Sequence, residues 1–222
     1  MMTTLLIDTS NQPLAVALVK DGNVLINYQS NIKKNHSLQL MPVIESLMDE
    51  AQLTPQSLSE IVVANGPGSY TGLRIGITTA KTMAYTLDIP LYEVSSLKAL
   101  AATYDYGNNL IVPLFDARRD HVFAGVYQYK DDKLETIKGD SYISIEALNQ
   151  FLKSRNYPYI FIGHDVLKLQ DKLEGRSLSK LPDASIMYNI KEQPVLNVHE
   201  LKPRYLKLSE AEQNWKNNQT KH

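Results

Sequence analysis

The chain has 222 residues and a formal net charge of -1, with 43% hydrophobic and 21% charged residues. This composition excludes the disordered and fibrous classes, and the missing basic excess argues against a protein that holds nucleic acid on its own. The absence of cysteine excludes disulfides, thiolate metal sites and cysteine nucleophiles. The sequence shows neither a signal-peptide pattern nor an apolar run of about 18 residues, so we expect a cytoplasmic protein without a membrane contact.

The first half of the chain alternates strand and helix patterns. Residues 3–10 are a short apolar strand, and residues 14–31 form a hairpin whose turn carries Asp21 and Gly22. Apolar residues at helical spacing predict a helix over 35–53, whose first residue is a good N-cap. The remaining elements expected in this half are a strand at 60–68, a helix at 71–87, a strand at 89–94 and a helix at 95–104.

The second half repeats this order. A strand over 108–116 ends at Asp116, as the first strand ends at Asp8, and strands over 121–129 and 134–141 stand where the first hairpin stood. The next counterparts are a helix at 144–156 and a strand at 159–165. Residues 199–212 are expected to pack back on the body. The repeated order suggests a duplication, with a first lobe at 1–104, a second lobe at 105–208 and a polar tail at 209–222.

Such a duplicated unit predicts an α/β fold with two lobes of the actin-like or Hsp70-like (ASKHA) type, with mixed sheets flanked by helices. In that architecture the hairpin after the first strand of each lobe faces a nucleotide. Here the corresponding loops, residues 8–13 and 116–121, contain no glycine that would let the backbone approach a phosphate. We therefore favour a turn-forming role for Asp8 over a metal-binding one, and leave Arg118 and Arg119 open between an anion contact and a solvated turn.

The stretch "NGPGSYTGLRIG", residues 65–76, holds four of the ten glycines. Its spacing matches neither the dinucleotide fingerprint nor a P-loop. The first two glycines fit a sharp exit from a strand, and the residues that follow them are suited to cap a helix. A stripe of small residues then continues along one helix face at steps of four: Gly72, Gly76, Ala80 and Ala84. The stripe indicates a close neighbour, which is either an element of the same lobe or another subunit.

Hydrolase motifs are not found. The sequence contains no G-x-S-x-G elbow, and "HELKP" at 199–203 lacks the second histidine of H-E-x-x-H. The histidines show no pairing at metal-ligand spacing, and His36 is interpreted as a residue of a first helical turn. We expect no catalytic residue, no metal site and no bound cofactor.

Six stretches in chain order are similar to the bacterial TsaB family, also called YeaZ: "LLIDTS", "HSLQLMPVI", "VVANGPGSYTGLRIGITTAKTMA", "VSSLKALA", "DARRDHVFAGVY" and "KPRYL". The resemblance runs to about residue 206, and its G-P-G-S-Y-T-G-L-R-I-G segment is specific. It implies an accessory subunit of the machinery that makes threonylcarbamoyladenosine in tRNA, working with the catalytic paralogue TsaD and the small ATPase TsaE. The paralogue's two metal-binding histidines fall on Ser96 and Leu100 of this chain.

The resemblance also implies where partners bind. The first helix and the glycine-bearing helix would pack against TsaD, or against a second copy of this chain when TsaD is missing, and tRNA would be contacted only indirectly. The interface residues expected on this basis are Leu40, Val43, Leu47, Gly72, Leu73, Gly76, Ile77, Ala80 and Ala84. The chain would then be a non-catalytic scaffold. The alternative is an enzyme in its own right, either an actin-like ATPase that uses Asp8 and Asp116 or a glycoprotease-like peptidase.

Overall fold

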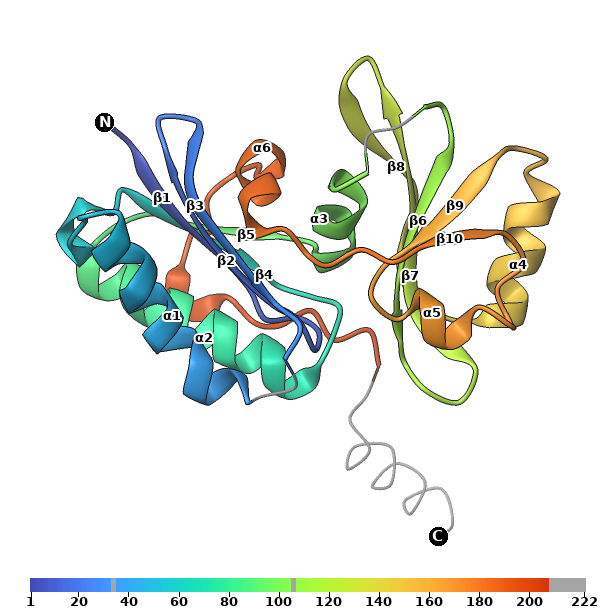
Figure 1. The fold of residues 1–222 in the computed structure, drawn as a ribbon, viewed down its shortest axis with the longest axis horizontal. Helices are drawn as coiled ribbons and strands as arrows, with labels where there is room; N and C mark the ends of the chain where they lie inside the picture. The colour runs from blue at the N-terminus through green and yellow to red at the C-terminus, as the bar shows by residue number, and fades with distance from the viewer. Residues whose placement is uncertain (33–34, 105–106, 208–222) are drawn as a thin grey trace, which may run out of the picture.

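The computed structural model describes residues 1–32, 35–104 and 107–207. Within these residues the chain forms two mixed five-stranded sheets, one in each lobe (Figure 1). Read from the edge strand of the hairpin to the opposite edge, the strand order is β3-β2-β1-β4-β5 in the first sheet and β8-β7-β6-β9-β10 in the second. The repeated order of strands confirms the predicted two-lobed α/β fold.

The first sheet joins an antiparallel meander to two parallel strands. Its strands are β1 (Thr3–Asp8), β2 (Leu14–Lys20), β3 (Asn23–Ser30), β4 (Glu60–Ala64) and β5 (Leu91–Val94). Every residue of β1 and β4 is buried, as expected for strands that are covered on both faces. The β2–β3 turn has φ of 49° at Asp21 and 81° at Gly22, the two positive values of a type I′ hairpin, which confirms the predicted hairpin.

Two helices, α1 (His36–Glu50) and α2 (Tyr70–Leu87), cover one face of the first sheet (Figure 1). Their apolar side chains form a single core with those of β1, β2 and β4. Asn35 and Ser69 are the N-caps, and each side chain accepts a hydrogen bond from a backbone N–H of the first turn. The predicted start of the first helix is therefore confirmed. A short 3-10 turn, η1 (Pro55–Ser57), leads from α1 into β4.

The second lobe repeats this plan with shorter helices. Its strands are β6 (Leu110–Asp116), β7 (His121–Lys130), β8 (Lys133–Ser144), β9 (Tyr159–Ile162) and β10 (Arg176–Leu178). Its helices are α4 (Ile145–Ser154) and α5 (Val166–Leu169). Apolar residues of α4 and α5 pack on β6, β7 and β9 around the fully buried Phe161. Each lobe thus has its own core on one face of its sheet.

One helix, α3 (Ser96–Ala102), lies between the two lobes (Figure 1). Ala99 packs with the second face of the first sheet. Leu97, Leu100 and Ala101 pack instead against Ile111 and other residues of the second sheet. The helix therefore belongs to both cores and fills the seam between them.

After β10 the chain returns to the first lobe. This part contains η2 (Ala184–Ile186), α6 (Met187–Ile190) and η3 (Val198–Glu200). Ala184 and Met187 are buried against the first sheet, and Leu201 joins the core under α2. The chain from about Ala184 onward therefore packs on the first lobe, whereas the predicted boundary at residue 208 assigns it to the second lobe. The expectation that residues near 199 pack back on the body is confirmed as far as residue 207, and the predicted tail at 209–222 lies outside the described residues.

Candidate functional site

The small-residue stripe of α2 faces inward, onto the end of β1. A Cβ atom added to Gly72 would lie 2.1 Å from the main-chain oxygen of Thr9, and one on Gly76 would lie 2.3 Å from Thr9 Oγ1. Thr9 Oγ1 also donates a hydrogen bond to the carbonyl of Gly72, at 2.7 Å. Van der Waals radii forbid a Cβ at either place. The close neighbour of the stripe is therefore the first sheet of the same lobe.

This geometry bears on the predicted interface. The burial pattern puts eight of its nine residues in the core of the first lobe, and Val43 is partly buried against the same core. The eight buried residues are Leu40, Leu47, Gly72, Leu73, Gly76, Ile77, Ala80 and Ala84. Side chains with so little exposed surface offer almost nothing to another subunit, so the structure does not support them as contact residues and their role in an interface stays a prediction. The physical reason is that helical spacing identifies a packed face but does not identify what covers it.

The opposite side of the same two helices is exposed, and we call it the outer helix face. It consists of Leu38, Met41, Pro42 and Glu45 of α1 and Thr71, Arg74, Thr78, Thr82 and Tyr85 of α2. Leu38 is 76% exposed, Met41 50% and Tyr85 66%. These residues were not predicted, although they fall at the positions between the buried ones in the helical repeat. Large apolar side chains on a helix surface, beside threonines, are suited to contact another protein.

The two strand-ending aspartates make matching turns. Asp8 Oδ1 accepts a hydrogen bond from the Ser10 N–H at 2.8 Å, and Asp116 Oδ1 accepts one from the Arg118 N–H at 2.8 Å. The predicted turn role of Asp8 is confirmed. Burial raises the pKa of Asp8 above its usual value, although its bonds to Ser10 act in the opposite direction. A carboxylate held in this way is directed at its own backbone.

A buried carboxylate, Asp165, connects the two loops that would face a nucleotide in an actin-like ATPase. Its Oδ2 accepts hydrogen bonds from Asn11 Nδ2 at 3.0 Å and from the Asp116 N–H at 3.1 Å, while Oδ1 pairs with Lys168 Nζ at 2.6 Å. Burial acts to raise the pKa of Asp165, but the bonds from Lys168, Asn11 and the Asp116 N–H outweigh it and hold the pKa below its usual value. The space between these loops is thus spanned by protein groups.

The two arginines of the second loop are exposed. Arg118 and Arg119, with Asp120, have φ of 65°, 53° and 56°, so the loop runs through three successive left-handed residues. The turn is closed by the His121 N–H, which donates to the Arg118 carbonyl at 3.1 Å. Such residues are strained and need surrounding bonds to hold them. The two side chains are thereby presented to solvent at one end of the second sheet, and their role stays a prediction.

The two positions predicted to correspond to the paralogue's metal-binding histidines have structural roles here. Ser96 Oγ accepts a hydrogen bond from the Gly66 N–H at 3.0 Å, and Leu100 is buried between α3 and the second sheet. The predicted placement of His36 in a first helical turn is confirmed, and its Nε2 is 2.8 Å from the carbonyl of Asn11. In the part of the chain that the structure describes, no group of three or more histidine, aspartate or glutamate side chains gathers as a metal site would require.

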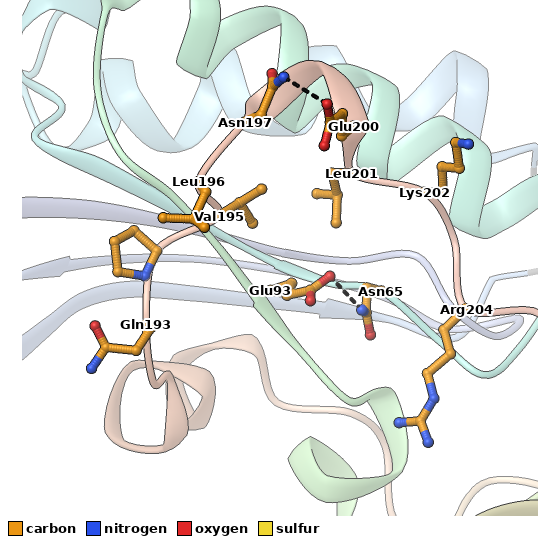
Figure 2. Close-up of a pocket in the computed structure, with 11 residues that line it drawn as sticks. Asn65, Glu93, Gln193, Val195, Leu196, Asn197, Glu200, Leu201, Lys202 and Arg204 are labelled. Carbon is orange, nitrogen blue, oxygen red and sulfur yellow. Dashed lines mark hydrogen bonds between the residues drawn. The ribbon is translucent and has the colours of Figure 1, made fainter.

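A groove of about 690 Å³ runs between the end of β5 and the returning chain (Figure 2). One wall is apolar and includes Val195 and Leu201, and the floor carries Asn65, whose amide donates to Glu93 Oε2 at 2.6 Å. Figure 2 shows Arg204 extending from the returning chain beside this floor. Its guanidinium group forms an ion pair with Asp140, and a second acidic residue near the groove, Glu192, pairs with Lys98. None of the helices in the described residues is long and apolar enough to span a membrane.

Comparison with known proteins identifies relatives over nearly the whole chain. The family model "TsaD: tRNA N6-adenosine threonylcarbamoyltransferase" matches residues 23–216. The Bacillus subtilis (strain 168) tRNA threonylcarbamoyladenosine biosynthesis protein TsaB is 43% identical, over 96% of this chain and 98% of its own. The protein of the same name from Buchnera aphidicola is 31% identical, over 91% and 96% of the two chains. A Pseudomonas aeruginosa crystal structure, described as similar to peptidase YEAZ, has a TM-score of 0.80 at 24% identity, covering 93% of this chain and 100% of its own, and supports the fold alone.

Proposed function

The chain belongs to the TsaB family of tRNA threonylcarbamoyladenosine biosynthesis proteins, and we propose that it acts there as a non-catalytic subunit that binds the transferase TsaD. In this role it holds TsaD in a working conformation and supports the transfer of threonylcarbamoyl to an adenosine of tRNA. The transfer chemistry belongs to TsaD. We place this activity in the cytoplasm, where a chain without cysteine is suited to a reducing environment.

The outer helix face carries the proposal. Its two helices lie side by side on one sheet, and they expose the large apolar side chains of Leu38 and Met41 to solvent. A partner of the same fold has an equivalent pair of helices, and two such pairs can pack as a four-helix layer. The family model that matches this chain describes TsaD itself, so TsaD is a partner of the required shape. A second copy of this chain would occupy the same face when TsaD is missing.

The two loops that would face a nucleotide in an actin-like ATPase, residues 8–13 and 116–121, support a non-catalytic role. Asp8 is directed at its own turn, and Asp165 bonds to both hairpin loops. Ser96 and Leu100 are engaged in a backbone bond and in core packing. Each of these side chains is accounted for by folding. The exposed Arg118 and Arg119 are instead suited to an anionic group of the assembled complex, and we assign them to TsaE, with tRNA contacted only through the complex.

Reconstitution of the modification reaction tests the proposal. Purified TsaD, TsaE and the enzyme that makes threonylcarbamoyl-adenylate, all from the same genome, are combined with tRNA, with and without this chain. We expect modified adenosine, measured by mass spectrometry of tRNA nucleosides, to form at a useful rate only when the chain is present with TsaD. Equal rates without the chain would overturn the activating role. Modification by this chain in the absence of TsaD would overturn the non-catalytic one.

A further inference from the structure

A second buried carboxylate, Asp140, also joins the two lobes. It lies on β8 of the second lobe, and its side chain is 1% exposed. Its Oδ2 accepts hydrogen bonds from Ser95 Oγ at 2.6 Å and from Arg204 Nη1 at 3.2 Å, and its Oδ1 accepts one from the Tyr127 hydroxyl. Ser95 belongs to the first lobe, and Arg204 to the returning chain. A single carboxylate therefore binds three segments of the chain at the seam.

Each donor to Asp140 is itself held in place. Ser95 is the N-cap of α3, where its Oγ accepts from the Lys98 N–H at 3.1 Å while donating to Asp140. The Arg204 N–H donates to the Asn65 carbonyl at 2.8 Å, which fixes that residue on the first lobe. Burial, and then the adjacent Asp140 carboxylate, raise the pKa of Tyr127, so its hydroxyl remains a donor. The bonds to Asp140 consequently fix the position of one lobe relative to the other.

The local backbone is shaped to fit this cluster. A Cβ on Gly125 would lie 2.7 Å from the ring of Tyr127 and 2.8 Å from Asp140 Oδ1. The pairing of β7 with β8 shifts register across this glycine, between Ala124 and Val126, and again between Val126 and Tyr127. The bulge and the missing side chain make room for the carboxylate and the phenol. A surface ion pair would need neither.

We propose that Asp140 and Asp165 are two latches that hold the lobes of this chain at one fixed angle. The two sets of bonds share no residue: Asp140 is bonded to Ser95 and Arg204, and Asp165 is bonded to Asn11. Between them α3 fills the seam with apolar side chains. Two separated attachments suppress rotation that a single one would permit. The fixed angle between the lobes is a property of the free chain and does not depend on the partner proposed above.

Spin-label distances test the latches. The chain has no cysteine, so cysteines introduced at the exposed Glu50 of α1 and Gln150 of α4 would be the only labelling sites. Pulsed electron double resonance between the labels should give one narrow distance distribution. With Asp140→Asn and Asn11→Ala combined, we expect the distribution to broaden or its mean to shift. Arg204→Met changes a half-exposed side chain and should fold normally. We expect it to broaden or shift the distance distribution in the same direction as the double variant, but to a smaller extent.

A matched control separates latching from general loss of stability. Glu60 is also a buried carboxylate with two donors, Thr4 and Lys191, but both are packed on the first lobe. Glu60→Gln should lower the melting temperature and leave the label distance narrow and unmoved. Circular dichroism would confirm that every variant is folded. An unchanged distribution in the folded double variant would overturn the proposal, because α3 packing alone would then fix the lobes.

Discussion

Gly76 of α2 lies directly over the Thr9 side chain, so close that a single added methyl group would stand 2.3 Å from Thr9 Oγ1 and 3.5 Å from Thr9 Cβ. The clash at this contact is with the hydroxyl group alone, since 3.5 Å between carbon atoms is ordinary packing. Gly72 differs, because there the obstructing atom is the main-chain oxygen of Thr9, at 2.1 Å.

This difference predicts a selective rescue. Gly76→Ala should lower the free energy of unfolding by about 1–3 kcal/mol, the usual cost of overpacking. In a Thr9→Ala background the same change should cost clearly less, giving a coupling of about 1 kcal/mol or more. Gly72→Ala should be equally harmful in both backgrounds. Urea unfolding of the variants measures each term, and additive effects of Thr9→Ala and Gly76→Ala would contradict the contact.

The same contact shows how far the sequence can predict this molecule. The steps of four from Gly72 to Ala84 correctly predicted a helix and a close approach, because both follow from local spacing. Which body approaches is not a local property, and only the fold places Thr9 beneath the stripe. The order of helices and strands along the chain was predictable because the two halves repeat it. The sequence indicated that the chain packs back on the body but not on which lobe, because short 3-10 turns such as Val198–Glu200 carry no hydrophobic period.

The roles of the latch residues could not be predicted from the sequence, for a related reason. Asp140 and Asp165 are separated in sequence from Ser95 and Asn11 by 45 and 154 residues, respectively. A lone aspartate near a strand end is most often a turn residue, which is what Asp8 proved to be. Nothing in the residues around Asp140 distinguishes it from the aspartates of an exposed hairpin. Its role depends on long-range packing, so only the three-dimensional arrangement reveals it.

Asp8→Asn should stabilise the protein at neutral pH. Burial raises the pKa of Asp8, so its ionised form is disfavoured in the folded state. The contribution of Asp8 to the free energy of unfolding is therefore most favourable at low pH and declines as the pH rises through the folded pKa. The amide keeps an oxygen for the Ser10 N–H and removes the buried charge. We expect a gain of roughly 1 kcal/mol at pH 7, shrinking at acid pH. Thermal melts at pH 5 and pH 7 measure it, and a loss of stability at pH 7 would show that the charge itself is needed.

Asp165→Asn should act in the opposite direction. The pKa of Asp165 is held below its usual value, so its ionised form stabilises the fold above the unfolded pKa of about 3.9, and this contribution is lost as pH falls through the folded pKa. At pH 7 we expect the variant to be less stable by about 1.5–3 kcal/mol, the usual worth of charged hydrogen bonds. The deficit should shrink below about pH 4. Urea unfolding at pH 7 and pH 3 checks the trend, and a deficit that does not depend on pH would contradict it.

Met41→Glu should weaken binding to TsaD without disturbing the fold. The side chain is 50% exposed on α1, and glutamate forms helices nearly as well as methionine. A charge placed in the apolar part of the outer helix face would have to be desolvated on binding, so we expect Kd to rise at least about tenfold, or 1.4 kcal/mol. Leu38→Glu should behave similarly. Isothermal titration calorimetry with purified TsaD measures the affinity.

Leu167→Glu is the matched control, because Leu167 is 57% exposed but lies on α5 of the second lobe, away from the outer helix face. It should leave the affinity for TsaD unchanged. If TsaD and a second copy of this chain compete for the outer helix face, Met41→Glu should also shift any homodimer toward monomer in sedimentation velocity. If Met41→Glu binds TsaD like the wild type while Leu167→Glu does not, the docking surface is on the second lobe and the outer helix face has been wrongly assigned.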